Sequence, residues 1–412
     1  MRTALTGRYR WVVLGVLWLT LLVSYFDRVA LGSALPFISK EIGLSPAVAG
    51  VVSGALFLSY TIVQVPAGAW TDRFGQRRVI AAAIAWWTVF SVLTGVVAGS
   101  LAALLVVRLL MGAGEGFHAP PLWRALSNWF EPGRRSLPLA LMLTALTLGP
   151  ALAPSIAFPL IATWGWRSVF YATLVPGVLC VVLVLAVMRD APGRRNLVTR
   201  PAPEAARRSR RWWVPHIWLT FGAFFCFGFV LYGLMNWLPT YLLTYRGLTL
   251  LRAGVFSTVP FLAGTVGMLL GAYVCQRWFN RSRRGFVAVT YLLTAVTVAA
   301  TATAPDATAS AVFLTASGFF LYAGLGPFWS VPMDVVRPGE VGTWLGFINM
   351  GTQLAGLLGP VAIGWIVQAS GSFTLVFAVM VAAMVAGAGC LALARPKPAA
   401  EDSPAELARA RS

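Results

Sequence analysis

Long apolar stretches recur along the whole chain and limit its possible folds more than any other feature. A helix that crosses a bilayer needs about 20 mostly apolar residues, and stretches of this length occur twelve times. They lie at 11–36, 47–70, 79–98, 101–126, 137–161, 166–188, 213–244, 252–276, 285–304, 308–333, 341–367 and 371–394. The sequence therefore predicts an all-α membrane protein with twelve transmembrane helices. The first stretch has no small-residue cleavage site, so we expect it to remain as a helix.

The composition excludes several classes of protein. Hydrophobic residues make up 58% of the chain and charged residues 11%, whereas about a quarter of the residues of a soluble domain are charged. A cytosolic enzyme is therefore excluded. The formal net charge of +19 would suggest a nucleic-acid partner in a soluble protein, but basic residues beside membrane spans report topology. We expect a lipid bilayer as the surroundings and no nucleic-acid partner.

The distribution of Lys and Arg predicts the orientation. Of the 32 basic residues, 25 fall at the N-terminus, in the even-numbered loops or after residue 394. Only Lys40, Arg167, Arg246 and Arg252 fall in the opposite loops. Because basic loops stay on the cytoplasmic side, we expect both termini in the cytoplasm. The predicted location is a bacterial-type cytoplasmic (inner) membrane, crossed by a multi-pass protein.

A polar, basic segment divides the chain into two hydrophobic halves. The predicted domains are an N-terminal six-helix bundle (1–188), a basic cytoplasmic linker (189–212), a C-terminal six-helix bundle (213–394) and a cytoplasmic tail (395–412). Leu148-Gly149-Pro150 in the first half recurs as Leu358-Gly359-Pro360 in the second. Tandem duplication is the simplest interpretation, and chance recurrence is the alternative. A pair of six-helix repeats is a known transporter plan with the substrate site between the halves.

A glycine- and arginine-rich pattern lies between the second and third spans. It reads Gly68-xxx-Asp72-Arg73-Phe74-Gly75-Gln76-Arg77-Arg78 and resembles the loop signature of the major facilitator superfamily. We expect a gating loop, in which Gly68 permits close helix approach and Asp72 accepts hydrogen bonds from a helix N-terminus or from an arginine across the halves. A basic cytoplasmic turn is the alternative. The candidate gating residues are Gly68, Asp72, Arg73, Gly75, Arg77 and Arg78.

Four charged residues lie deep in predicted spans of the first half: Asp27, Arg28, Arg108 and Glu115. A charge at mid-membrane costs about 2.5 to 3.5 kcal/mol on insertion scales, so it persists where it pairs, meets water or serves function. Arg108 and Glu115 are two helical turns apart on one face, about 10 Å along the axis. We expect Asp27 to lie near Arg108, and Arg28 near Glu115 or an anionic substrate. Two structural ion pairs are the alternative.

Further patterns narrow the resemblance. Ser24-Tyr25-Phe26-Asp27-Arg28, Arg108-xxx-Gly112-xx-Glu115, Trp129-Phe130-xx-Gly133-Arg134-Arg135 and Gly165-Trp166-Arg167-xx-Phe170 are together similar to the anion:cation symporter family. This resemblance implies that Asp27 and Glu115 are the protonatable pair. It also implies that Arg28 grips a substrate carboxylate through a bidentate fork, while Arg108 holds one of the acids in its charged form.

The same resemblance implies a wider substrate site. Tyr25 and Tyr60 match positions that face the substrate, and Trp329, Ser330 and Asn349 match positions near substrate hydroxyl groups. Gln353 shares a helix face with Asn349 because it lies four residues later. Interhelical hydrogen bonding is the alternative for these amides. The candidate substrate-binding residues are Tyr25, Arg28, Tyr60, Arg108, Trp329, Ser330, Asn349 and Gln353.

Two further polar residues are candidates for the site. His118, one turn after Glu115, extends a proton path in one interpretation and is a packing residue in the other. Asn236 in the seventh span is a possible contact for substrate. The four cysteines have no spacing typical of a metal site, so we expect no metal and no cofactor, with the proton as the coupling ion.

These features predict a secondary active transporter: proton-coupled symport of a small organic anion, a carboxylate, by alternating access. The alternative is a proton-driven antiporter that exports a drug or an amphiphilic metabolite, because Gly149-Pro150 in part resembles the Gly-Pro motif of drug/proton antiporters. An enzyme is not expected, since His118 and His216 form no HxxxxD or HExxH pattern and no GxSxG occurs. The expected state is a monomer.

Overall fold

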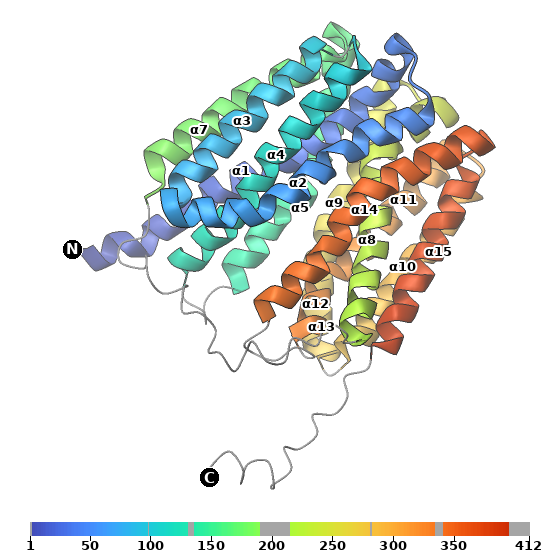
Figure 1. The fold of residues 1–412 in the computed structure, drawn as a ribbon. Helices are drawn as coiled ribbons and strands as arrows, with labels where there is room; N and C mark the ends of the chain where they lie inside the picture. The colour runs from blue at the N-terminus through green and yellow to red at the C-terminus, as the bar shows by residue number, and fades with distance from the viewer. Residues whose placement is uncertain are drawn as a thin grey trace.

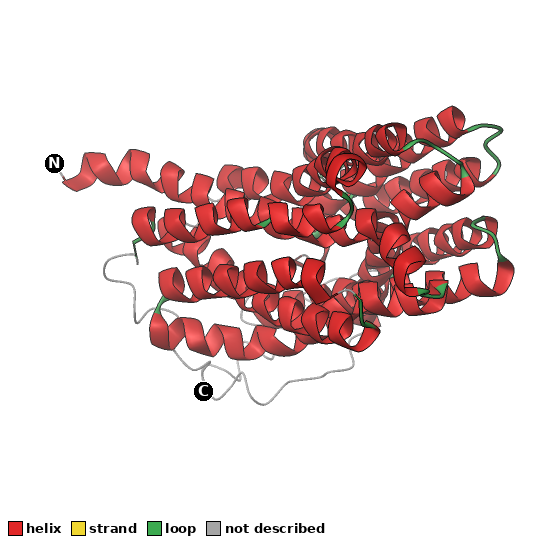
Figure 2. Ribbon diagram, turned by 90° about the horizontal axis from the view of Figure 1, so that it is seen from above, coloured by secondary structure: helices red, strands yellow, loops and turns green. Residues whose placement is uncertain are grey.

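The structure, a computed structural model, is built from helices that cross a membrane. It describes residues 2–97, 99–130, 136–189, 215–280, 282–333 and 341–394, and this described part consists of helices joined by short turns (Figures 1 and 2). Twelve helical segments of the described part are long and apolar enough to span a bilayer. The predicted class and the predicted twelve spans are therefore confirmed.

Seven helices form the first six spans. They are α1 (Arg2–Ile42), α2 (Pro46–Phe74), α3 (Gln76–Val97), α4 (Leu101–Trp129), α5 (Ser136–Trp164), α6 (Arg167–Ala172) and α7 (Leu174–Val187). The short α6 and the following α7 together make the sixth span. Helix α1 extends beyond the predicted 11–36 at both ends, because the apolar stretch marks only the part of a helix that lipid covers.

The second half contains eight α-helices and one π-helical turn in the described part. They are α8 (Pro215–Thr240), η3 (Tyr241–Tyr245), α9 (Leu250–Trp278), α10 (Arg283–Ala302), α11 (Ala307–Ala323), α12 (Leu325–Phe328), α13 (Ser330–Met333), α14 (Val341–Ser370) and α15 (Thr374–Leu393). The turn η3 continues α8 in the seventh span, and the tenth span runs from α11 into α13.

Local sequence determines where the helices near the site begin and end. Gly43 adopts a φ of 69°, a conformation that favours glycine, and separates α1 from α2. Ser45 caps α2 by accepting a hydrogen bond from the Val48 amide at 3.4 Å, and Pro46 occupies the first turn. Gly75, with a φ of 82°, separates α2 from α3. We call the end of the bundle at Gly75 the terminal face, because α1 begins there, and the end at Gly43 the distal face.

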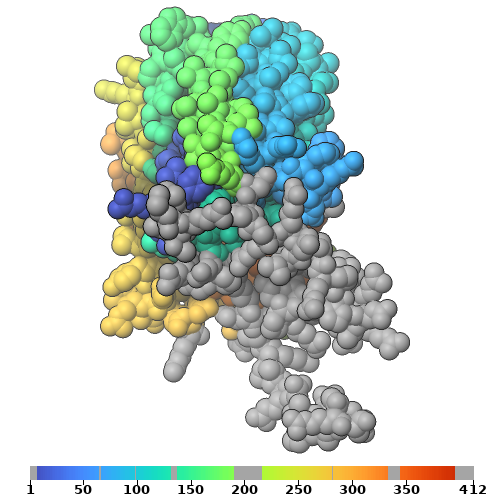
Figure 3. Space-filling model, turned by 90° about the vertical axis from the view of Figure 1, so that its left-hand side faces the viewer, coloured from blue at the N-terminus to red at the C-terminus, as the bar shows by residue number. Residues whose placement is uncertain are grey.

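The two halves share one packing pattern. In the first half α1 packs on α5, α4 packs on both α2 and α3, and α3 packs on α7. In the second half α8 packs on α14, α11 packs on both α9 and α10, and α10 packs on α15. Figure 3 shows the outer flank on which α7 lies beside α3. Each helix of the first half thus has a counterpart with equivalent neighbours, which is the arrangement that tandem duplication predicts.

The halves meet along three pairs of helices: α2 with α14, α5 with α9, and α1 with α8. The predicted linker at 189–212, apart from Arg189, and the predicted tail at 395–412 lie outside the described residues. The loops that contain Arg134, Arg135 and Arg337 lie outside them too.

Candidate functional site

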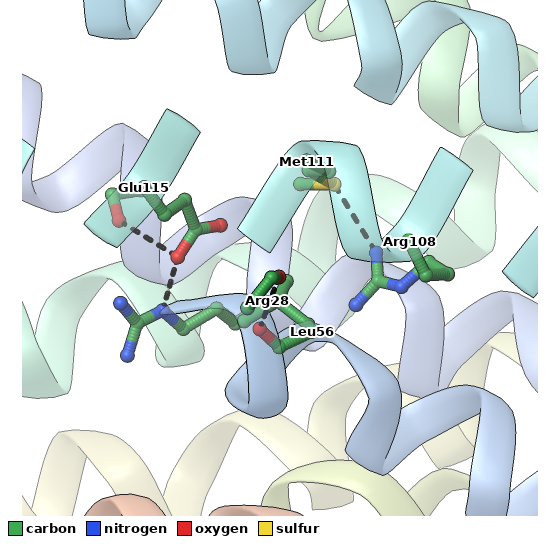
Figure 4. A network of polar contacts seen from close by, with 7 residues as sticks. Arg28, Leu56, Arg108, Met111 and Glu115 are labelled. Atoms are coloured by element: carbon green, nitrogen blue, oxygen red, sulfur yellow. Dashed lines mark hydrogen bonds and ion pairs between the residues drawn. The ribbon is translucent and has the colours of Figure 1, made fainter. Parts of the chain in front are cut away.

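A buried ion pair joins α1 to α4 in the middle of the first half. The Nε atom of Arg28 lies 2.6 Å from Oε2 of Glu115, and the two side chains are 6% and 0% exposed. The hydroxyl of Ser24 donates to the same carboxylate oxygen at 3.4 Å. Arg28 thus lies beside Glu115, as the sequence analysis expects, and Figure 4 shows the arginine reaching the acid from the neighbouring helix.

The Arg28–Glu115 pair leaves hydrogen-bonding capacity unused. Nη1 of Arg28 and Oε1 of Glu115 are buried and have no hydrogen-bond partner among the described residues. A guanidinium presents five N–H donors and binds a carboxylate most strongly through two of them. Because Arg28 engages Glu115 through Nε alone, the Nη edge is available to a second anion. A buried polar group calls for a hydrogen-bond partner, and a bound anion would supply one at this edge of Arg28.

Aromatic rings surround the Arg28 guanidinium. Its Cζ atom lies 4.6 Å from the ring centroid of Tyr25, 4.8 Å from that of Tyr60 and 5.8 Å from that of Phe57. Such cation–π contacts contribute about 0.5 to 2 kcal/mol each, more when desolvated. They stabilise a cation in a buried place without neutralising it, so the site keeps its attraction for an anion. We call Arg28, Glu115, Tyr25 and Tyr60 the Arg28 site.

Two glycines place the tyrosines of the Arg28 site. A Cβ atom on Gly116 of α4 would lie 2.6 Å from the carbonyl oxygen of Tyr60, and a Cβ on Gly149 of α5 would lie 2.9 Å from Cβ of Tyr25. Contacts this short are not tolerated, so only glycine lets α2 and α5 approach their neighbours here. The aromatic walls are therefore a consequence of close helix packing.

The second half completes one side of this site. The ring of Tyr232 on α8 lies 4.4 Å from the ring of Phe57 on α2. Gly356 of α14 contacts the same Phe57 ring, since a Cβ there would lie 2.5 Å from its Cδ1 atom. The Arg28 site therefore lies at the junction of the two halves, where a change in their relative position alters it.

Asp27 and Arg108 are near each other but form no ion pair in the described part. Arg108 directs Nη1 to the sulfur of Met111 on its own helix at 3.2 Å (Figure 4). Asp27 is 2% exposed, and its Oδ1 atom has no hydrogen-bond partner among the described residues. Asp27 and Arg28 point about 100° apart on their helix, so only Arg28 reaches the rings at the junction. Asp27 and Arg108 thus interact electrostatically, as the sequence analysis expects, but these two described residues form no ion pair.

His118 lies in the core of the first half. Its Nε2 atom is 3.0 Å from the hydroxyl oxygen of Thr20, and its ring meets the ring of Trp87 edge-on at 4.9 Å. Both partners are neutral, and the histidine is 2% exposed. These contacts are those of a well-packed histidine. His118 forms no described hydrogen bond with Asp27 or Glu115, so its contacts give no support to the interpretation that it extends a proton path.

The candidate residues of the second half divide into two groups. Gln353 is 6% exposed and its Oε1 atom has no partner among the described residues. It lies one turn from Gly356, so it borders the junction at Phe57. The Asn236 side chain instead donates to the carbonyl of Tyr232 at 2.8 Å within its own helix. Asn349 lies one turn beyond Gln353 toward the terminal face.

Trp329 and Ser330 lie further from the Arg28 site. The ring of Trp329 packs on Phe224 of α8 at 4.8 Å and on its neighbour Phe328 at 5.9 Å. Both residues belong to the end of the tenth span at the terminal face. Trp329 contacts α8 in this conformation, and neither residue has a described contact with Arg28.

Sequence reasoning left out Phe57 and Ser24 as site residues. Phe57 lies one turn before Tyr60 on the same face of α2, and Ser24 lies one turn before Arg28 on α1. The spacing of three residues from Phe57 to Tyr60 and of four from Ser24 to Arg28 could therefore have identified both as site residues. Tyr232 carried a weaker signal, because an aromatic residue in an apolar helix is usually a packing residue.

The candidate gating loop is tied to its own half in this conformation. Asp72 forms an ion pair with Arg124 of α4, so its partner is not an arginine across the halves. Arg77 donates to the carbonyl of Leu185 on α7. No atom lies within 4 Å of a Cβ built on Gly68, so the close helix approach expected there is absent from this conformation.

Hydrogen bonds join the two halves toward the distal face. The Ala47 amide donates to Oε1 of Gln368 at 3.2 Å. The hydroxyls of Ser155 on α5 and Thr258 on α9 lie 2.7 Å apart. A Cβ on Gly54 would lie 2.5 Å from the carbonyl oxygen of Leu357. Together these contacts hold the two halves against each other on the distal side of the bundle.

Comparisons with known proteins agree with this architecture. The sequence profile described as Major Facilitator Superfamily matches residues 17–358. The chain is 31% identical over 403 residues to the probable sulfoacetate transporter SauU of Cupriavidus necator, covering 93% of each protein. It is 28% identical over 377 residues to the hexuronate transporter of Bacillus subtilis, covering 88% of this chain and 89% of that protein.

A solved structure has a similar fold. The crystal structure of a bacterial homologue of the human lysosomal transporter Spinster, in an inward-facing and unoccupied conformation, superimposes with a TM-score of 0.73. The sequence identity is 22%, and the match covers 94% of this chain and 95% of that one.

Proposed function

The chain belongs to the major facilitator superfamily, and from that premise we propose that it is a proton-coupled symporter that carries a small organic anion by alternating access. The superfamily resemblance expected from residues 68–78 is confirmed, and the protein is a multi-pass membrane transporter, not an enzyme. Its relatives include anion transporters. We propose the proton as the coupling ion, a small organic anion as the substrate and import as the direction of transport.

The observation that carries the proposal is the single Nε contact between Arg28 and Glu115. One guanidinium faces one carboxylate in a buried place, and the Nη edge of the guanidinium is unused. An incoming anion therefore shares Arg28 with Glu115. Two anions so close repel each other at low dielectric, and protonation of Glu115 removes that repulsion. Proton binding and anion binding thus favour each other, which is what symport requires.

Asp27 supplies a second protonation site in this proposal. It is buried near Arg108 without an ion pair, so its charge is only partly compensated. A monovalent anion that enters against a negative inside potential works against about 2.3 kcal/mol per 100 mV. Each proton contributes about 1.4 kcal/mol per pH unit. Transport with two protons, one on each acid, makes the process electrically favourable.

Alternating access would use the junction of the halves. The contacts of α2 with α14 and of α5 with α9 close the distal face, and we assign this face to the extracellular side because the basic loops belong to the terminal face. In this conformation the site is separated from the outside. Rocking of the halves would break these contacts and bring the gating loop at Gly68 against the second half.

The chemistry of the site favours a compact carboxylate or a similar planar anion. Arg28 offers a fork geometry, and Tyr25, Tyr60 and Phe57 offer apolar walls with two hydroxyl groups. Gln353 offers an unused amide oxygen from the second half. Sulfoacetate and hexuronate, after which two relatives are named, both carry a carboxylate. Aliphatic and aromatic acids of similar size are equally good probes.

Two measurements test the proposal. Purified protein is first screened for thermal stabilisation by small carboxylates and sulfonates, since a ligand at 100 times its dissociation constant stabilises by about 2.7 kcal/mol. Uptake of the best ligand is then measured in proteoliposomes with an acidic exterior. We expect accumulation that collapses when an ionophore dissipates the proton gradient. Uptake that ignores the proton gradient but follows a sodium gradient would assign a different coupling ion.

The second candidate function is a proton-driven antiporter, and the observation that favours it is the close contact of Gly149 with α1. Gly149-Pro150 belongs to a motif that in part resembles one in drug/proton antiporters, and Gly149 lies against Tyr25 of the Arg28 site. The two functions differ in the direction of linked flow. In proteoliposomes, an antiporter accumulates its substrate when the proton gradient is directed outward. A symporter accumulates its substrate when the proton gradient is directed inward.

A further inference from the structure

A groove of about 450 Å³ opens on the flank of the first half. It lies between α2 and α3 and has α4 as its floor. Its lining includes Trp70, Phe74, Arg78, Ala82, Trp86 and Phe117. Figure 1 shows α3, α4 and α2 side by side on this flank, and α4 packs on both of the other helices. The groove is therefore separated from the Arg28 site by the thickness of α4.

The groove faces lipid. Trp70 is 55% exposed and Trp86 is 47% exposed, and both lie in or beside membrane-spanning segments. Val89 on α3 and Val106 on α4, two of the helices that form the groove, are also more than half exposed, at 53% and 54%. Apolar side chains at such positions are in contact with acyl chains. A cavity of this size falls in the range of small-molecule sites.

Fixed contacts keep the groove open. The indole Nε1 of Trp86 donates to the carbonyl of Leu110 at 2.7 Å. The ring of Trp70 packs on Phe117 at 5.2 Å and on Phe74 at 5.9 Å. Gly114 forms part of the floor, and a Cβ there would lie 2.6 Å from Cδ1 of Trp86. The aromatic walls are therefore held apart by hydrogen bonding and packing.

Positive charge is confined to one end of the groove. Arg78 lines it near the terminal face, and Cζ of Arg73 lies 5.2 Å from the ring of Phe74, which also lines it. Neither arginine forms an ion pair with a described residue. The nearby acid Asp72 is paired with Arg124. Arg78 and Trp86 are eight residues apart, about 12 Å along α3, so a cationic mouth leads into an apolar channel.

We propose that this groove binds an anionic phospholipid, with one acyl chain between Trp70 and Trp86 and the phosphate at Arg78 and Arg73. The occupant must combine an apolar chain with a negative group at one end, because the lining changes from cationic to apolar along one direction. The terminal face is the more basic side of the protein, and basic pockets between membrane helices on that side bind anionic headgroups. A zwitterionic lipid offers the same chain but brings an ammonium group toward two arginines.

Binding of phosphatidylglycerol to the purified protein tests the proposal. Bound lipid is counted by native mass spectrometry during titration with dioleoyl phosphatidylglycerol or with the phosphatidylcholine of the same chains. We expect one phosphatidylglycerol to bind more tightly than the rest, and more tightly than phosphatidylcholine. Arg78→Gln should weaken this site about fivefold, the effect of one arginine near a headgroup. Ala82→Trp should abolish it by filling the groove.

A matched control separates this site from general attraction to basic loops. Arg277 is an exposed arginine at the same face, beside the exposed Trp278, at the end of α9. Arg277→Gln should leave the tight site unchanged. Ala82→Leu serves if Ala82→Trp fails to fold, as judged by gel filtration and thermal melting. Unchanged binding in Arg78→Gln and in the Ala82 variants would overturn the proposal. So would equal loss in Arg277→Gln, or equal affinity for phosphatidylcholine or free oleate.

Discussion

Arg28 contacts Glu115 through Nε alone, at 2.6 Å from Oε2, and its Nη1 atom has no hydrogen-bond partner among the described residues. The contact joins α1 to α4 within the first half, while the rings around Arg28 reach the second half through Phe57 and Tyr232. The Arg28 guanidinium is therefore sensitive both to the protonation of Glu115 and to the relative position of the two halves.

Removal of the Arg28 guanidinium should weaken anion binding strongly. Arg28→Ala leaves Glu115 as a buried unpaired carboxylate, and loss of one partner of a buried charged pair costs about 2 to 5 kcal/mol. We expect ligand affinity, measured by thermal stabilisation, to fall by at least about thirtyfold. Arg28→Lys keeps the charge but not the fork, so it should bind more weakly than wild type and better than Arg28→Ala. Equal affinity in all three proteins would contradict the assignment of Arg28.

The ring of Tyr60 should matter more than its hydroxyl group. Tyr60→Phe keeps the cation–π contact with Arg28, which has a distance of 4.8 Å, whereas Tyr60→Leu removes it. The expected cost of the leucine is about 0.5 to 2 kcal/mol, seen as a raised KM for uptake. The phenylalanine variant is the matched control. If Tyr60→Phe is as impaired as Tyr60→Leu, the hydroxyl group binds substrate directly.

A disulfide across the distal face should stop transport reversibly. The hydroxyl oxygens of Ser155 and Thr258 are 2.7 Å apart on α5 and α9, so cysteines at both positions are close enough to bond after small adjustments. The pair is made in a background without the native cysteines. Oxidation should block uptake, and dithiothreitol should restore it. Each single cysteine variant should transport under both conditions, and full activity of the oxidised pair would show that this contact does not open during transport.

The ion pair of Asp72 with Arg124 should contribute little to stability. Its side chains are 51% and 27% exposed, and exposed pairs are worth about 0.2 to 1 kcal/mol. A double-mutant cycle with Asp72→Asn and Arg124→Gln should therefore give a coupling energy below about 1 kcal/mol in thermal unfolding. The same variants should change transport rates more than stability if the loop acts in gating. Large losses of stability with normal transport would make the loop a structural element.

Much of the fold follows from the sequence because the membrane limits the choices. The apolar stretches mark twelve spans, and Gly68 to Arg78 marks the superfamily, since lipid admits few alternatives to helices of about 20 residues. The breaks inside spans were not predictable in this way. The sixth span is divided at Thr173 and the tenth at Gly324 and Trp329, although hydropathy continues through these positions.

Part of the candidate site also follows from spacing. Residue positions indicate that Arg28 lies near Glu115, because α1 and α4 each carry two buried charges in the first half. Spacing could not show that Arg108 turns to Met111 or that Asp72 pairs with Arg124. Such choices depend on side-chain rotamers and on the conformation of the two halves. Phe57 was missed because an aromatic residue in an apolar helix looks the same in a core and in a binding site.

The most direct test of the coupling mechanism uses Glu115→Gln in proteoliposomes. The glutamine keeps the size of the side chain and a hydrogen-bond acceptor for Arg28, but it cannot bind or release a proton. Two activities are compared with wild type: accumulation driven by an acidic exterior, and exchange of labelled for unlabelled anion without any gradient. Asp27→Asn is assayed in parallel as the second acid.

We expect Glu115→Gln to lose gradient-driven accumulation and keep exchange, because the halves can still rock around a bound anion while proton coupling is absent. The exchange rate should also become insensitive to pH over the range in which wild type responds. Gradient-driven accumulation at the wild-type level in Glu115→Gln would rule out this coupling mechanism, since coupling would then not pass through the acid that Arg28 contacts.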